Sequence, residues 1–367
     1  MKVKAKILLY SVILVGQFMV FFGLKYANNF IEVYYSNGIY PFIADAMRIG
    51  LGWIPFSFGD FIYLLLILLL IKWIIKLIAK ILYFIKNKNS VNNSILKGTI
   101  GNQVAKILIT LNVIIFYFHM AWGFNYYRLP MHEILEIEED YSTEQLLEVT
   151  KDFIELSNNL HESIQDNDSL KVDFGNDQMV WMNMAPMAFE NYHLNNTRIK
   201  FSNVSLKKSL LTVPLTYMGY SGYLNPLTGE AQINGWINAY KTPVLCLHEM
   251  AHQLGFAKEN EANFIAIDAG LKHPDRHFQY SASLYALKFC LNDLYLRDPE
   301  KYAMVAKEIK PGIFKNYQEL RDFWKPYQDG LLEKVSHSVY DSYLKVNNQP
   351  KGIDTYNYVV ALLVNYY

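Results

Sequence analysis

Charged side chains are scarce in this 367-residue chain, because Asp, Glu, Lys and Arg together make up 19% of it. An average globular protein contains roughly 25% of these residues. The 34 basic and 34 acidic residues cancel, and the sequence contains no basic patch interleaved with aromatics, no glycine-rich phosphate loop and no internal repeat. These absences argue against nucleic acid as a partner, because no net field attracts a polyanion.

Cysteine is also scarce, with two residues in the whole chain, Cys246 and Cys290. Both fall in the C-terminal part, which we expect to lie outside the cytoplasm, where a disulfide is permitted. Two thiols in predicted helices are equally consistent with separate core residues. The sequence leaves the choice open.

Apolar residues, in contrast, reach 52% and are concentrated near the N-terminus. Three stretches have the roughly 20 residues needed to cross a bilayer, at 7–26, 61–79 and 104–124. A run such as "LLLILLLI" has no polar face for water, which favours spanning over burial in a soluble core. The first stretch follows "MKVKAK" and lacks a small-x-small cleavage site, so we predict an uncleaved signal-anchor.

The lysines predict the orientation of these spans. Seven lysines and no acidic residue lie between positions 72 and 106 (Lys72, Lys76, Lys80, Lys86, Lys88, Lys97 and Lys106). The segment 27–60 contains one arginine, Arg48, and no lysine. The positive-inside rule therefore places the N-terminus and the second loop in the cytoplasm. We expect a multi-pass protein of the inner membrane, with everything after the third span on the periplasmic side.

The composition from position 126 onwards is that of a soluble domain. We therefore expect a helical membrane domain at 1–125 and an exported α+β domain at 126–367, mainly helical with a small β-sheet. A capping box at Ser142 and Gln145 predicts a helix over about 143–163. The segments "LLTVPLTYMG" (210–219) and "EAQINGW" (230–236) predict a β-hairpin that directly precedes a histidine-bearing helix, and "GEAQING" could be an edge or an ordinary strand.

The helix after this hairpin carries the motif "HEMAH". His248 and His252 are four residues apart, so both imidazoles lie on one helical face and could bind one Zn²⁺. Glu249 follows the first histidine and is placed to act as general base toward a water activated by the metal. Gly255 is a good C-cap for this helix.

A catalytic zinc needs a third protein ligand. The "HExxHxxGxxH" layout would place it at position 258, where Lys258 is a poor ligand. A glutamate on the following helix remains, either Glu259 or Glu261. The segment "NEANF" resembles the ligand helix of glutamate zincins, which favours Glu261 and leaves Glu259 as a cap or supporting group. Asp268 and Asn260 are candidates to orient a histidine, and Tyr340, Tyr343 or Tyr356 could donate to an oxyanion.

Several segments together resemble one bacterial family. They are the three spans, "WGFNYYR" (122–128), "GYLNPLTGEAQIN" (222–234), "HEMAHQLGFAKENEANF" (248–264) and "YLKVNNQPKGIDTYNYVV" (343–360). The family is catalogued as a domain of unknown function, consists of three-span membrane proteins and carries an HExxH motif like that of zinc metallopeptidases. The resemblance implies a zincin-like exported domain with a zinc-peptidase site.

We therefore expect a membrane-anchored zinc metallopeptidase of the gluzincin type that hydrolyses extracytoplasmic or envelope polypeptides. His248, His252 and Glu261 would hold Zn²⁺, with Glu249 as the base. The alternative is a zinc-stabilised binding or scaffolding module that does not cleave, although such a module needs no base. A transporter is disfavoured because the spans contain no broken helix and no acidic residue.

Overall fold

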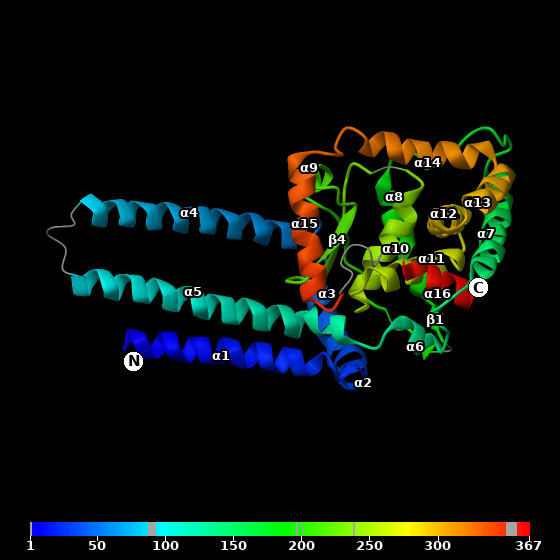
Figure 1. Cartoon of the computed structure of the whole chain (residues 1–367). Coiled ribbons are helices and arrows are strands. Elements are labelled where there is room, and N and C mark those ends of the chain that lie inside the picture. Colours follow the sequence, from blue (N-terminus) through cyan, green and yellow to red (C-terminus); the bar gives the residue numbers. More distant parts are fainter. Residues whose placement is uncertain (1, 87–92, 196, 200, 238, 350–357) are drawn as a thin grey trace.

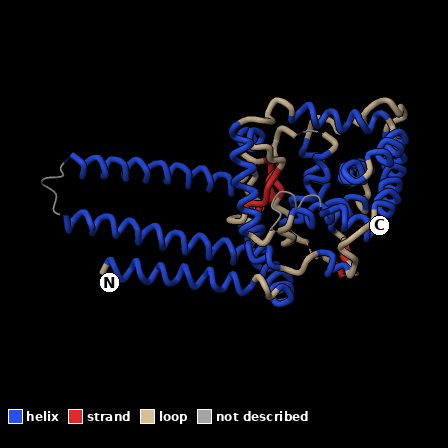
Figure 2. The backbone as a smooth tube through the Cα atoms, in the orientation of Figure 1, coloured by secondary structure: helices blue, strands red, loops and turns tan. Residues whose placement is uncertain are grey.

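A computed structural model describes residues 2–86, 93–195, 197–199, 201–237, 239–349 and 358–367. Three long helices leave one side of a compact, mostly helical body, and the C-terminus lies on the far side of that body (Figure 1). The strands are short and all belong to the body (Figure 2). This arrangement confirms a mainly helical chain with a small sheet.

The three long helices are α1 (Val3–Leu24), α4 (Phe58–Lys86) and α5 (Asn93–Ala121). Each includes a stretch that is long and apolar enough to cross a membrane, which confirms the three predicted candidates. α1 and α5 lie side by side, and a Cβ added at Gly101 would be 2.6 Å from Val3. α4 runs apart from this pair (Figure 1).

The segment between α1 and α4 is folded. It comprises α2 (Asn28–Phe30), the π-helix η1 (Ile31–Ile39) and α3 (Tyr40–Leu51). α3 buries Tyr40, Ala44 and Arg48, which recur every four residues on one face. After α5 come the 3-10 helix η2 (Gly123–Tyr127) and the short α6 (Met131–Leu135). These elements join the long helices to the body.

The body is built mainly from helices. They are α7 (Thr143–Ile164), α8 (Gln178–Met184), η3 (Ala185–Phe189), α10 (Lys241–Gln253), α11 (Glu259–Leu271), α12 (Arg276–Arg297), α13 (Pro299–Val305), η4 (Ala306–Glu308), α14 (Pro311–Trp324), α15 (Leu331–Val346) and α16 (Val359–Tyr366). α12 packs on α7, and α10 packs on α11 and α12. The capping box at Ser142 and Gln145 starts α7 as predicted. Cys246 and Cys290 are free, buried thiols.

The sheet before α10 contains three strands in the order β3 (Leu206–Lys208), β5 (Glu230–Ile233), β4 (Gly222–Asn225). β4 and β5 form an antiparallel hairpin directly before α10, with its second strand where it was predicted, whereas β3 runs parallel to β5. A separate pair joins β1 (His193–Leu194) to β2 (Thr197–Arg198). β5 therefore lies in the centre of its sheet, and β4 is an edge strand.

The first strand of the hairpin was misplaced in the sequence-based prediction. Residues 212–217 form the helix α9 (Thr212–Tyr217), and the strand is the next segment, Gly222–Asn225. Pro214 lies in the first turn of α9, where its missing N–H costs no helical hydrogen bond. The Thr216 hydroxyl donates to the Thr212 carbonyl at 2.8 Å, which supports the short helix from within.

Candidate metal centre

The motif residues lie on α10, which is buried on all sides. His248 is 8% exposed, Glu249 2% and His252 5%. One helical turn separates the two imidazoles, whose ring centroids are 4.7 Å apart. Polar side chains in such an enclosed helix need partners. The neighbouring helix α11 supplies one.

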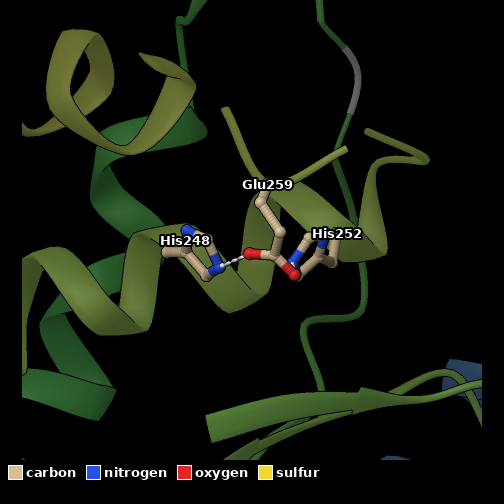
Figure 3. Close-up of side chains that lie close together, drawn as sticks. All are labelled: His248, His252 and Glu259. Carbon is tan, nitrogen blue, oxygen red and sulfur yellow. Dashed lines mark ion pairs between the residues drawn. The ribbon is translucent and has the colours of Figure 1, made fainter. Parts of the chain in front are cut away.

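α10 and α11 are joined by a tight turn. Gly255 has φ +89°, and its N–H donates to the His252 carbonyl at 2.9 Å, as expected for a helix C-cap. A side chain at this position would also meet the Tyr40 ring at 2.8 Å. The turn brings the first residue of α11, Glu259, back over the histidines (Figure 3).

The carboxylate of Glu259 lies between the two imidazoles (Figure 3). Its Oε2 is 3.2 Å from Nε2 of His248, and its Oε1 is 3.8 Å from Nε2 of His252. One potential ligand atom from each of the three residues lies within 4.8 Å of the others. Two imidazole nitrogens and one carboxylate form the donor set of many catalytic zinc sites.

Glu261 does not join this cluster. Its carboxylate accepts a hydrogen bond from the Met131 backbone N–H at 3.1 Å and pairs with Lys258 at 3.0 Å. Two residues correspond to a rotation of about 200° on an α-helix, so Glu259 and Glu261 point in opposite directions. The sequence-based preference for Glu261 over Glu259 therefore does not match the geometry.

A backbone carbonyl orients one of the two histidines, His252. Nδ1 of His252 lies 2.7 Å from the Phe256 carbonyl, to which it can only donate, so in the neutral ring Nε2 carries the lone pair, on the side of Glu259. Nδ1 of His248 is buried and has no hydrogen-bond partner among the described residues. Neither Asp268 nor Asn260 makes a described hydrogen bond to these rings; Asp268 instead pairs with Lys272 at 2.7 Å.

Burial and mutual charge shift the pKa of each group. Burial lowers the pKa of His248 and raises that of Glu249 to about 8. Burial also opposes the charge on His252, but hydrogen bonding to Glu259 and the nearby carboxylates outweigh it and raise the pKa to about 9. Burial disfavours a charged Glu259 too, yet its bonds to both histidines hold the pKa well below the usual range. A buried site with opposed shifts is typical of functional centres.

Glu249 lies against the edge strand. A Cβ built on Gly222 of β4 would be 2.6 Å from Oε1 of Glu249. Oε2 of the same carboxylate is buried with no hydrogen-bond partner among the described residues. Glu249 therefore holds an unsatisfied acceptor next to the histidines, and glycine at position 222 provides the space for it.

A cavity of about 640 Å³ opens over the cluster and is lined by His248, Glu249, His252 and Glu259. Most of the remaining lining is aromatic or aliphatic, and it includes seven tyrosines: Tyr63, Tyr126, Tyr220, Tyr223, Tyr285, Tyr340 and Tyr343. Tyr340 donates a hydrogen bond to Glu259. Tyr356, the third tyrosine considered from the sequence, lies outside the described residues.

Lys241 and His337 also line the cavity, and sequence reasoning did not single them out. The ammonium of Lys241 donates to the Ser221 hydroxyl at 3.0 Å, and burial lowers its pKa to about 8. Lys241 begins α10, seven residues before His248, so a search for cations two turns before the motif could have found it. It places a positive charge in the cavity near Glu249.

The C-terminal carbonyls of α10 are bound by the N-terminal part of the chain. The Tyr40 hydroxyl and the Arg48 guanidinium donate to the Gln253 carbonyl at 2.9 and 3.2 Å. The Trp122 indole donates to the His252 carbonyl at 3.3 Å. Helix ends leave such carbonyls without partners, so these donors fix the motif helix in place.

Comparison with known proteins identifies one family. The family described as "Protein of unknown function (DUF3810)" matches residues 35–364. No curated protein and no solved structure matches the chain. The match includes α4, α5, the β4–β5 hairpin, the His248–His252–Glu259 cluster and α15. The chain therefore belongs to the DUF3810 family.

Proposed function

We propose that this protein is a membrane-anchored zinc metallopeptidase with a zincin-like body. The observation that carries the proposal is the convergence of His248, His252 and Glu259 in a cavity that also contains Glu249. The donor set, its burial and the Nε2 lone pair of His252 all fit Zn²⁺. A scaffolding module would not need the unsatisfied Glu249 carboxylate beside these donors.

His248, His252 and Glu259 would hold the ion. Zn²⁺ bound there supplies Lewis-acid polarisation of a carbonyl and lowers the pKa of water. Burial raises the pKa of Glu249, which favours proton uptake. Glu249 would accept a proton from the attacking water at its free Oε2 and would later deliver it to the leaving amine. Lys241 and Tyr343 are donors on the cavity wall that can orient the scissile carbonyl.

The edge strand offers a way to hold the substrate. β4 pairs with β5 on one side only among the described residues, and Gly222, Tyr223 and Leu224 line the cavity. An extended peptide can add to such an edge through backbone hydrogen bonds. This places a peptide bond beside Glu249, because Gly222 contacts that carboxylate.

The charge pattern supports an orientation for the membrane helices. The lysine-rich ends of α4 and α5 lie at the end far from the body (Figure 1). By the positive-inside rule this end is cytoplasmic, which puts the N-terminus inside and the body on the periplasmic side of the inner membrane. The substrates would then be envelope or other extracytoplasmic polypeptides.

The test uses the full-length protein in detergent micelles, because the N-terminal segments bind α10. We expect one zinc per chain by elemental analysis in the wild type and in Glu249→Gln, and loss of zinc in His248→Ala. Wild type should cleave a peptide library in a chelator-sensitive manner, and Glu249→Gln should not. A wild type without stoichiometric zinc would contradict the metal site, and equal cleavage by Glu249→Gln would contradict the base.

A further inference from the structure

The stretch Phe61–Ile71 of helix α4 is apolar on every side and is covered by little of the protein. Eight consecutive residues, from Leu64 to Ile71, are each between 40% and 63% exposed. A helix that packs against a partner hides at least one stripe, as α5 does with Ala105 at 4% and Asn112 at 3%. The part of α4 that extends away from the body therefore has room for an apolar partner.

The start of α4 is nevertheless fixed to the body. Glu230 of β5 accepts hydrogen bonds from the backbone N–H groups of Phe58 and Gly59, and Asp60 accepts from Leu210 N–H at 2.8 Å. The Tyr223 hydroxyl of β4 also donates to Asp60. The separation of α4 from α5 is thus set by buried polar contacts at the body.

Both α4 and α5 reach the cavity that contains the metal cluster. Tyr63, on the second turn of α4, lines the cavity and stacks on Tyr223 of β4, with ring centroids 6.4 Å apart. Trp122, the residue after α5, lines the same cavity and donates to the His252 carbonyl. The two helices that stand apart in Figure 1 therefore each contribute to the wall of one site.

The membrane boundary falls near this wall. Tyr63 belongs to a helix that is apolar enough to span a bilayer, and Trp122 directly follows another. Trp53, in the loop before α4, is 77% exposed, as expected for an aromatic residue at the interface. α15 crosses this side of the body (Figure 1) and exposes an apolar stripe that includes Leu331 and Val339. The cavity thus lies at the level where α4 and α5 leave the bilayer.

We propose that the cavity receives its substrate from the bilayer: a membrane-inserted polypeptide whose spanning helix docks on α4, on the side that faces α5, and whose juxtamembrane segment enters past Tyr63. The apolar, unpacked surface of α4 matches a spanning helix. The free edge of β4 matches the extended backbone that follows it, and a lipid offers no such run of backbone groups. This inference rests on the proposed peptidase function and names its substrate class.

Docking can be tested without hydrolysis. Ile67 lies one turn beyond Tyr63 on the same face of α4, and Leu65 lies on the opposite face at nearly the same depth; they are 49% and 46% exposed. Each is replaced by Cys in a Glu249→Gln background and labelled with a benzophenone maleimide. The native Cys246 and Cys290 are buried and are therefore shielded from the reagent. The protein is reconstituted in phosphatidylcholine vesicles with a reporter that has one spanning helix of about 20 residues and a polar tail.

We expect the reporter to be captured from Ile67→Cys in several-fold higher yield than from Leu65→Cys. Equal yields, or capture of lipid alone from position 67, would overturn the inference. The wild type should also cleave this reporter faster than the same tail held on the vesicle by an acyl chain at equal density. Ile67→Trp should remove this advantage, and Leu65→Trp should keep it.

These outcomes separate the two proposals. Selective capture from position 67 without chelator-sensitive cleavage would support the docking surface and contradict the peptidase. Cleavage of both tails at the same rate would support the peptidase and overturn delivery from the bilayer.

Discussion

The hydroxyl of Tyr340 donates a hydrogen bond to Oε1 of Glu259 at 2.5 Å. The two residues are 81 positions apart and lie on α15 and α11. Tyr340 also stacks on Tyr343, whose hydroxyl is 3.2 Å from that of Tyr126. The position of the cluster carboxylate therefore depends on how α15 packs over the cavity.

Tyr340→Phe removes this hydrogen bond and keeps the ring. We expect zinc affinity to fall about 10-fold to 100-fold, the usual effect of losing a group that orients a metal ligand. Competition with a chromogenic chelator measures the zinc affinity. Tyr343→Phe is the matched control and should change the affinity far less, so equal effects of the two substitutions would argue against an orienting role for Tyr340.

Glu259→Gln and Glu261→Gln distinguish the two acidic residues of α11. The first should lower zinc affinity by more than about 100-fold, because it removes a ligand and not only a supporting contact. The second should leave zinc stoichiometry unchanged, since its carboxylate contacts Met131 and Lys258. Zinc content after dialysis is the readout, and loss of zinc from Glu261→Gln alone would contradict the cluster.

The choice between these two glutamates shows what the sequence lacks. Spacing identified both as reachable from the histidines, and a resemblance to known ligand helices favoured the second. The direction of each side chain depends on where α11 begins, which is set by the turn at Gly255 and by its contact with Tyr40. Tyr40 is more than two hundred residues away, so local pattern carries no information about it.

The raised pKa of Glu249 predicts pH-dependent stability of the metal-free protein. A carboxyl whose folded pKa rises from 4.5 to about 8 destabilises the fold as pH rises across that window, because the unfolded chain loses its proton first. His252, raised from 6.5 to about 9, stabilises the fold fully below 6.5 and loses this contribution as pH rises through 9. These two groups should therefore make the thermal unfolding midpoint fall between about pH 5 and pH 8, whereas the lowered pKa values of His248 and Lys241 contribute in the opposite direction.

Glu249→Gln should reduce this fall, because the amide does not titrate. Glu138→Gln, at an exposed position, is the control and should retain the wild-type slope. Parallel pH profiles for Glu249→Gln and wild type, measured by thermal scans in chelator, would show that burial does not hold Glu249 protonated.

Gly222→Ala tests the contact between β4 and the base. The added methyl would be 2.6 Å from Glu249 Oε1 and 2.6 Å from the Gln232 carbonyl, so the carboxylate and the strand must both move. We expect about 1–3 kcal/mol of destabilisation and a loss of kcat/KM of about 100-fold, as for a reacting group displaced by about 1 Å. Gly50→Ala, which meets no atom within 4 Å, should behave as wild type.

Arg48→Met tests the support of α10 from α3. It removes the Arg48 donor from the Ser202 carbonyl and leaves the Gln253 carbonyl with the Tyr40 hydroxyl alone, at a cost of about 1–3 kcal/mol. The apparent unfolding midpoint and the zinc affinity should both fall. Arg321→Met, whose guanidinium bonds only the exposed side chain of Gln318 among the described hydrogen bonds, should leave both unchanged.

The parts of the fold that repeat at a regular period were predictable. The three apolar helices, α7 with its capping box and the second strand of the hairpin before α10 follow from local pattern. The fold of the segment between α1 and α4 does not follow from local pattern, because its helices are short and are stabilised by distant partners such as Gln253 for Arg48. Residues 212–217 were misassigned because β-branched content outweighed the helical turn that Pro214 permits.

The bonds from Tyr40, Arg48 and Trp122 to the end of α10 have a consequence for how the protein can be regulated. Cutting the chain after Trp122 would separate α10 from all three donors. The cluster would then lose its support on release from the apolar helices, so a proteolytic cut at this point should act as an off switch for zinc binding. Under the proposed function, hydrolysis would be confined to the membrane surface.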